Sequence, residues 1–67
     1  MSPENMVTMV NQIAMFFDTQ PGMDPCDGVV DHLRDFWEPR MREQLRNYVA
    51  DGGGGLIPTA IKAARRI

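Results

Sequence analysis

Side chains that could cross-link the fold or bind a metal are almost absent from the sequence. Cys26 is the only cysteine and His32 the only histidine among 67 residues. An internal disulfide is therefore impossible, and a zinc site of the Cys/His type would lack ligands. A chain this short has a marginal core and usually gains stability from a disulfide, a metal or a partner subunit. We therefore expect a partner to supply the missing support.

Long hydrophobic runs and a basic N-terminal region are also missing. The longest early apolar run covers residues 13–17, which is too short for a membrane span. We expect neither a signal peptide nor a membrane contact, and without a disulfide framework the cytoplasm is the expected compartment.

Positive charge is scarce in the first half of the chain. Residues 1–38 carry seven acids and one base, whereas residues 39–67 carry six bases and two acids. Six scattered bases on a chain with a net charge of −2 do not indicate nucleic-acid binding.

Strand signals are missing too, because apolar and polar residues never alternate over four or more positions.

Proline marks the start of each helix that the sequence predicts. Ser2 before Pro3 reads as an N-cap followed by a first helical residue, and Asp24 before Pro25 repeats this signal. Apolar residues then recur at three- and four-residue spacing. We predict one all-α domain over residues 1–67, a small bundle of three helices plus a short C-terminal helix, with helices at about 3–18, 25–37, 39–50 and 58–66.

Four consecutive glycines separate the last two predicted helices. This run, residues 52–55, fits neither a phosphate-binding loop nor a dinucleotide fingerprint, because Ile57 and Pro58 occupy positions that need glycine or lysine. We interpret the run as a helix C-cap and a flexible hinge. The role of the segment that follows stays open.

Candidate chemical groups are few, and each has a structural explanation. Acids spaced four apart from Asp27 to Asp35 are more typical of an exposed or docking face than of a metal site, and Cys26 and His32 stand at no recognisable nucleophile spacing. We predict no catalytic, cofactor-binding or metal-binding residue. The six methionines fit an adaptable binding surface and a gap-filling core equally well. Trp37 likewise fits a position in the core and a position in an interface equally well.

Three sequence blocks resemble a known family. They are Asn11-Gln12-Ile13-Ala14 with Phe16-Phe17, then Asp31-His32-Leu33 leading to Phe36-Trp37-Glu38-Pro39-Arg40-Met41-Arg42, and finally the glycine run with Leu56 and Pro58. In order and spacing they are similar to the delta subunit of NAD-dependent, molybdenum-containing formate dehydrogenases, over nearly the whole chain.

The resemblance implies an accessory subunit of an enzyme that oxidises formate to carbon dioxide and reduces NAD⁺. In such complexes the alpha subunit holds bis-molybdopterin guanine dinucleotide and iron–sulfur clusters, and the beta and gamma subunits carry FMN and further clusters. The delta subunit is expected to bind none of these cofactors and to support assembly, stability or cofactor retention without performing chemistry.

We expect this subunit to dock on the alpha subunit through its surplus aromatic and basic surface. Trp37 is the expected anchor, with Arg40 and Arg42 pairing with carboxylates at the rim. The full set of residues expected to bind the partner is Gln12, Phe17, His32, Phe36, Trp37, Pro39, Arg40, Met41 and Arg42.

Two other functions are compatible with the same sequence. One is a transient maturation chaperone for molybdenum cofactor insertion, in which Arg40, Arg42 and Arg46 hold phosphates. The other is a free-standing homodimeric regulator, in which the acidic half of one copy meets the basic half of another. The sequence does not decide which face contacts which subunit, or whether the chain folds or dimerises alone.

Overall fold

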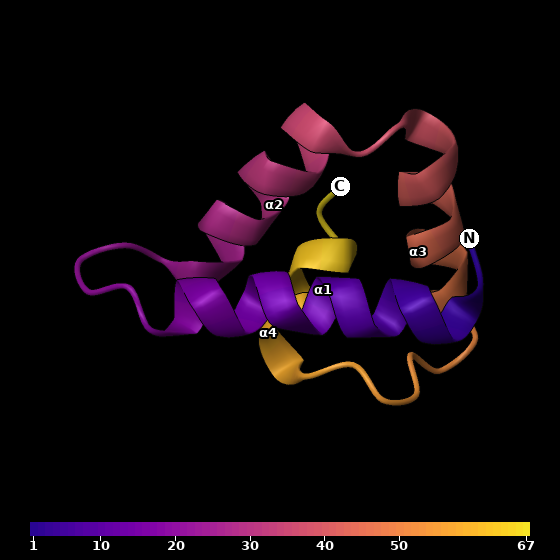
Figure 1. Cartoon of the computed structure of the whole chain (residues 1–67), viewed down its shortest axis with the longest axis horizontal. Coiled ribbons are helices and arrows are strands. Elements are labelled where there is room, and N and C mark those ends of the chain that lie inside the picture. The colour runs from indigo at the N-terminus through magenta and orange to yellow at the C-terminus, as the bar shows by residue number, and fades with distance from the viewer.

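Four helices, each beginning at a proline, make up the fold of residues 1–67 in the computed structural model (Figure 1). They are α1 (Pro3–Asp18), α2 (Pro25–Phe36), α3 (Pro39–Ala50) and α4 (Pro58–Ala64), and there is no strand. The predicted all-α class, three helices plus a short C-terminal one, is confirmed. No helix has the length and apolar composition that a membrane crossing requires.

Side-chain caps fix the starts of the first two helices. The Ser2 hydroxyl accepts a hydrogen bond from the Asn5 backbone N–H at 3.2 Å, and the Asp24 carboxylate accepts one from the Cys26 N–H at 2.8 Å. Each bond satisfies a backbone donor that has no partner inside its helix. α3 and α4 lack such a side-chain cap and begin at a proline after an extended residue.

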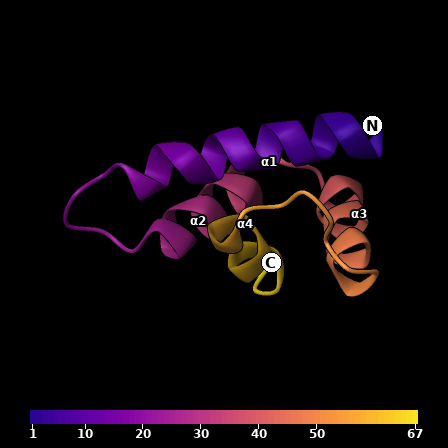
Figure 2. The same ribbon diagram turned by 90° about the horizontal axis from the view of Figure 1, so that it is seen from below.

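The shortest helix occupies the centre of the molecule. α4 packs against each of the other three helices, and α1 lies along one side of the α2 and α4 pair, with α3 at one end (Figure 2). Ala60, Ala63 and Ala64 of α4 are completely buried, because their small side chains let the neighbouring helices approach closely. The segment after the glycine run is therefore part of the core.

One apolar cluster holds the four helices together, and no polar or charged side chain is buried in it. The α1 contribution faces both α2 and α4, which explains why the apolar stripe of this helix is broader than a single face. The cluster comprises Met6, Val10, Ala14, Val29, Val30, Leu33, Trp37, Leu45, Leu56, Ala60, Ala63 and Ala64.

The glycine run closes α3 with a C-terminal cap. The Gly53 N–H donates to the Tyr48 carbonyl and the Gly52 N–H to the Val49 carbonyl, both at 3.0 Å. This pair of bonds is the Schellman motif, which places a residue of positive φ just after the helix. Gly52 and Gly53 have φ values of +126° and +64°, which favour glycine over residues with a Cβ.

The remainder of the run is tied to the rest of the molecule. Asn11 of α1 donates its side-chain N–H to the Gly55 carbonyl at 2.9 Å and accepts from the Ile57 N–H at 3.0 Å. The Tyr48 hydroxyl donates to the Gly54 carbonyl at 2.6 Å. The C-cap part of our interpretation is confirmed. The segment that we interpreted as a flexible hinge is tied by hydrogen bonds to side chains of α1 and α3.

Candidate protein-interaction site

Phe36 and Trp37, at the end of α2, lie in different environments, and only Phe36 is on the surface as its predicted partner-binding role requires. Trp37 is 6% exposed and belongs to the core, whereas Phe36 is 74% exposed. The reason is local: Trp37 is the C-cap residue, and its extended backbone, with φ −95° and ψ 137°, leaves the helical path. The expected anchor is therefore not on the surface of this chain, and its neighbour is.

Arg42 also differs from the expectation that it is free to meet a partner carboxylate. Its guanidinium donates to the carbonyls of Trp37 at 2.8 Å and Arg34 at 3.2 Å. These carbonyls lie at the end of α2, where backbone acceptors lack helical partners, so a cation there is favourable. Arg42 is therefore engaged in holding the α2–α3 corner, while Arg40 is exposed.

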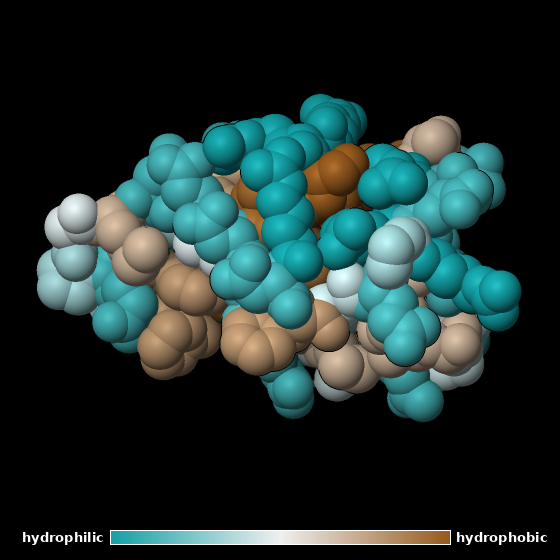
Figure 3. All heavy atoms as spheres, turned by 90° about the horizontal axis from the view of Figure 1, so that it is seen from above, coloured by the Kyte–Doolittle hydropathy of each residue, from teal (hydrophilic) through white to brown (hydrophobic).

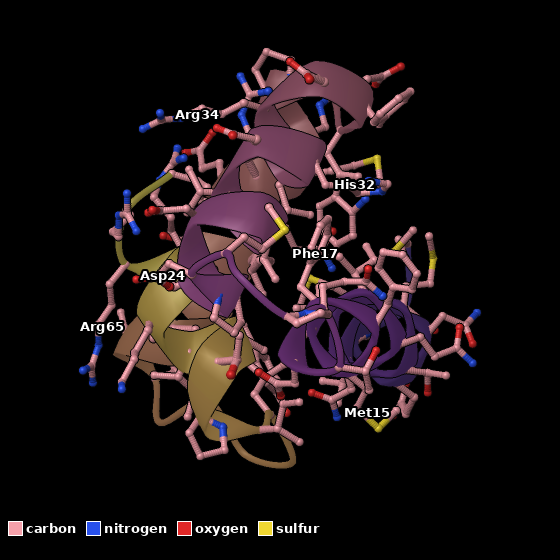
Figure 4. The ribbon with its side chains drawn as sticks, turned by 90° about the vertical axis from the view of Figure 1, so that its left-hand side faces the viewer. Met15, Phe17, Asp24, His32, Arg34 and Arg65 are labelled. Carbon is pink, nitrogen blue, oxygen red and sulfur yellow. The ribbon has the colours of Figure 1, made fainter.

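A shallow apolar groove opens between α1 and α2. It encloses about 300 Å³ and is lined by Gln12, Ile13, Phe16, Phe17 and His32. We call this surface, together with the adjoining Phe36, the α1–α2 groove. In Figure 4, Phe17 and His32 meet between the two helices, whereas Arg34 and Arg65 lie on the opposite side of the molecule.

Aromatic rings form most of the groove's walls. The Phe16 and Phe17 rings pack edge to face with centroids 5.2 Å apart, and the rings of His32 and Phe36 are 4.9 Å apart. Phe16 is 58% exposed despite its apolar ring. In Figure 3 apolar side chains lie along the lower edge of the view and in a patch near its upper middle, while hydrophilic ones cover much of the remaining visible face.

Gly28 gives the groove its shape. A Cβ at this position of α2 would lie within 2.8 Å of three ring carbons of Phe17, which is closer than atoms can approach. The missing side chain thus lets the Phe17 ring approach α2 closely. Glycine in a helix costs about 1 kcal/mol relative to alanine. The close contact with Phe17 explains why a glycine stands at this position despite that cost.

Two exposed carboxylates of α2 are the sequence neighbours of groove residues, and we call this pair the acidic edge. Asp31 and Asp35 are exposed and precede His32 and Phe36 on α2, and neither forms an ion pair. The single ion pair of the chain joins Arg66 to Asp27 at 2.6 Å, on the α4 side of the helix. Hydrogen bonds to Asp27 and to the Cys26 sulfur raise the pKa of Arg66 above its ordinary value.

A second open cavity, of about 340 Å³, lies between α3 and α4. Its lining contains none of the residues that we expected to bind a partner: it consists of Arg46, Val49, Ala50, Ala64 and Arg65. Arg46 also donates to the carbonyl of the last residue, Ile67, at 3.2 Å. No group of three or more His, Cys, Asp or Glu side chains that could hold a metal is present in the chain.

The predicted partner-binding residues fall into two sets. Gln12, Phe17, His32 and Phe36 come together at the α1–α2 groove. The remainder lie at the α2–α3 corner: Trp37 in the core, Met41 half-buried against it, Arg42 bonded to carbonyls, and Pro39 and Arg40 exposed at the start of α3.

Sequence reasoning missed three residues that matter for the groove. Ile13 and Phe16 line the groove but were not among the residues expected to bind a partner, and Ile13 is half-buried while Phe16 is exposed. Gly28 was likewise not among the predicted residues. A glycine inside an otherwise regular helix can indicate a close approach by another element, and that signal was present.

The fold and this surface together define a class: a small all-helical protein with an exposed groove lined partly by aromatic rings. A family model described as the NADH-dependent formate dehydrogenase delta subunit, FdsD, matches residues 5–64. The chain therefore belongs to this delta subunit family. No curated protein and no solved structure shows significant similarity to the chain.

Proposed function

We propose that the chain is a non-catalytic accessory subunit of a cytoplasmic formate dehydrogenase, and that it docks on the large alpha subunit through the α1–α2 groove. The alpha subunit would hold the molybdenum cofactor and iron–sulfur clusters, and the beta and gamma subunits the FMN and further clusters. Membership of a delta subunit family supports a place in a multi-subunit complex.

The observation that carries the docking proposal is the exposure of Phe16 and Phe36 beside one cavity. Phe36 is 74% exposed, and a ring that large loses apolar contact with water only when another molecule covers it. Buried aromatic anchors dominate the binding energy of most protein interfaces. If this chain binds only the assembled form of the large subunit, its binding energy stabilises that form. This chain then needs to perform no chemical step.

The groove is tested by co-expressing Phe16→Ala/Phe36→Ala with the other subunits. We expect loss of the chain from the purified complex, seen by native mass spectrometry, and a fall in formate oxidation. The matched control is Met15→Ala, because Met15 is 51% exposed and lies on the side of α1 away from α2 (Figure 4). Circular dichroism of each isolated variant checks that it still folds.

The same measurement separates a permanent subunit from a maturation chaperone. A fixed ratio of this chain to the large subunit in active enzyme supports the proposal. Absence of the chain from mature, fully active enzyme would instead indicate a transient role. Equal retention of the double variant and the parent chain would exclude the groove as the docking surface.

A further inference from the structure

We propose that the occupant of the α1–α2 groove is a basic, amphipathic helical segment of the partner subunit, whose apolar side chains enter the cavity and whose Lys or Arg side chains face Asp31 and Asp35. This inference rests on the proposed function and adds to it the chemistry of the partner.

Charge provides the first argument. Asp31 and Asp35 stand one turn apart on the exposed surface of α2, each next in sequence to a residue of the groove, and neither forms an ion pair within this chain. No lysine or arginine lines the groove. Two carboxylates beside an apolar surface favour a partner that brings positive charge, since opposite charges across an interface guide encounter and fix register.

Three arginines that belong to α2 or are bonded to it are engaged elsewhere. Arg34, on the same helix, donates to the Arg66 carbonyl at 2.9 Å, and Arg66 pairs with Asp27. Arg42 is bonded to the end of α2. The fold therefore directs its nearby arginines away from Asp31 and Asp35.

The walls of the groove determine the form of the partner segment. Both walls are helices, whose backbone donors and acceptors are paired within each helix, so no free strand edge is available for an added strand. Binding must come from side chains that enter between two helices, as when an amphipathic helix lies in an apolar groove. A cavity of about 300 Å³ accommodates one or two large apolar side chains of such a helix.

A second copy of this chain is a poorer occupant. A two-fold dimer through this surface is self-complementary, so the Asp31 and Asp35 side chains of both copies would enter one interface. Like charges brought together in this way oppose association. A partner with basic residues avoids that repulsion.

The first experiment reverses the charge of the edge in the complete complex. Asp31→Lys/Asp35→Lys is co-expressed with the other subunits, and its retention in the purified complex is measured over a salt series. We expect retention to fall about tenfold at low salt, with a smaller difference at high salt because ions screen exposed charges. The matched control, Glu43→Lys/Asp51→Lys, reverses two exposed acids of the α3 region and should stay within about twofold of the parent chain.

The pattern of losses separates this inference from the docking proposal. Loss of Phe16→Ala/Phe36→Ala with full retention of Asp31→Lys/Asp35→Lys would overturn the basic partner and leave docking intact. Retention of both variants would overturn both. Equal losses for the charge reversal and its control would also contradict a specific acidic edge.

A second measurement identifies the occupant directly and does not depend on a folded charge variant. A photo-crosslinking benzoylphenylalanine in place of Phe36, which is exposed at the groove, is activated in the assembled complex. We expect the crosslinked peptide to come from a partner subunit and to carry Lys or Arg within a turn of apolar residues. A neutral or acidic peptide, or a peptide of a second copy of this chain, would overturn the proposal.

Discussion

On the α4 side of α2, charged side chains are bonded within the chain, whereas on the α1 side aromatic rings line a groove that is open to solvent. Arg34 and Arg66 link α2 to the C-terminal segment, and no comparable bond crosses the α1–α2 groove. The difference between the two sides of one helix indicates where the chain completes itself and where it depends on another molecule. A protein with a small core must use its few polar links where its own helices meet.

The largest expected contrast lies between two adjacent aromatic residues. Trp37→Ala should lower the free energy of unfolding by about 3–5 kcal/mol, because it removes a buried ring. A chain of this length has about 3–10 kcal/mol in total, so much of the variant should be unfolded. Phe36→Ala should change the free energy of unfolding by less than about 0.5 kcal/mol. Urea denaturation followed by circular dichroism measures both, and equal losses would contradict the placement of the two rings.

The different positions of these two residues show how far the sequence could predict the site. Helix starts were readable because proline and a capping residue act locally. At the end of α2, however, Phe36 and Trp37 differ by about 100° of rotation around the helix, and the backbone of the cap residue decides which ring turns inward. Apolar spacing alone does not contain that information.

Contacts between distant residues were also outside the reach of the sequence pattern. Arg34 meets the carbonyl of Arg66, and Arg46 that of Ile67, across 32 and 21 positions of the chain. The alanines of α4 were visible as one face, yet its central position follows from the packing of all four helices. Periodicity predicts which face of a helix is apolar, but it does not predict which other helix packs against that face.

A smaller contrast lies between two arginines at the α2–α3 corner. Arg42→Ala should cost about 1–3 kcal/mol, because it removes charge-assisted hydrogen bonds to two carbonyls. Arg40→Ala should stay within about 0.5 kcal/mol, since Arg40 is exposed. Thermal unfolding at matched pH compares them. If Arg40→Ala proved the more destabilising variant, the corner would not be held as the structure describes.

Neighbouring amides on α1 give a third contrast, again of a bonded and a free side chain. Asn11→Ala should cost about 1–2 kcal/mol, because Asn11 bonds both Gly55 and Ile57. Gln12→Ala should leave the free energy of unfolding within about 0.5 kcal/mol of the parent value, since Gln12 is exposed at the groove. Hydrogen exchange of the Ile57 amide provides a local readout, and unchanged protection in Asn11→Ala would argue against the bridge.

The smallest effect is expected for the exposed ion pair. Arg66 and Asp27 are about half exposed, so water and salt screen their attraction even though the Nη1–Oδ1 distance is 2.6 Å. Arg66→Gln should therefore lower the melting temperature less than Arg42→Ala does, and the difference from the parent should shrink as salt is added. Because hydrogen bonds raise the pKa of Arg66, this residue remains protonated across the neutral range. A melting-temperature difference that persists in high salt would mean that Arg66 acts through its hydrogen bonds to α2 rather than through its charge.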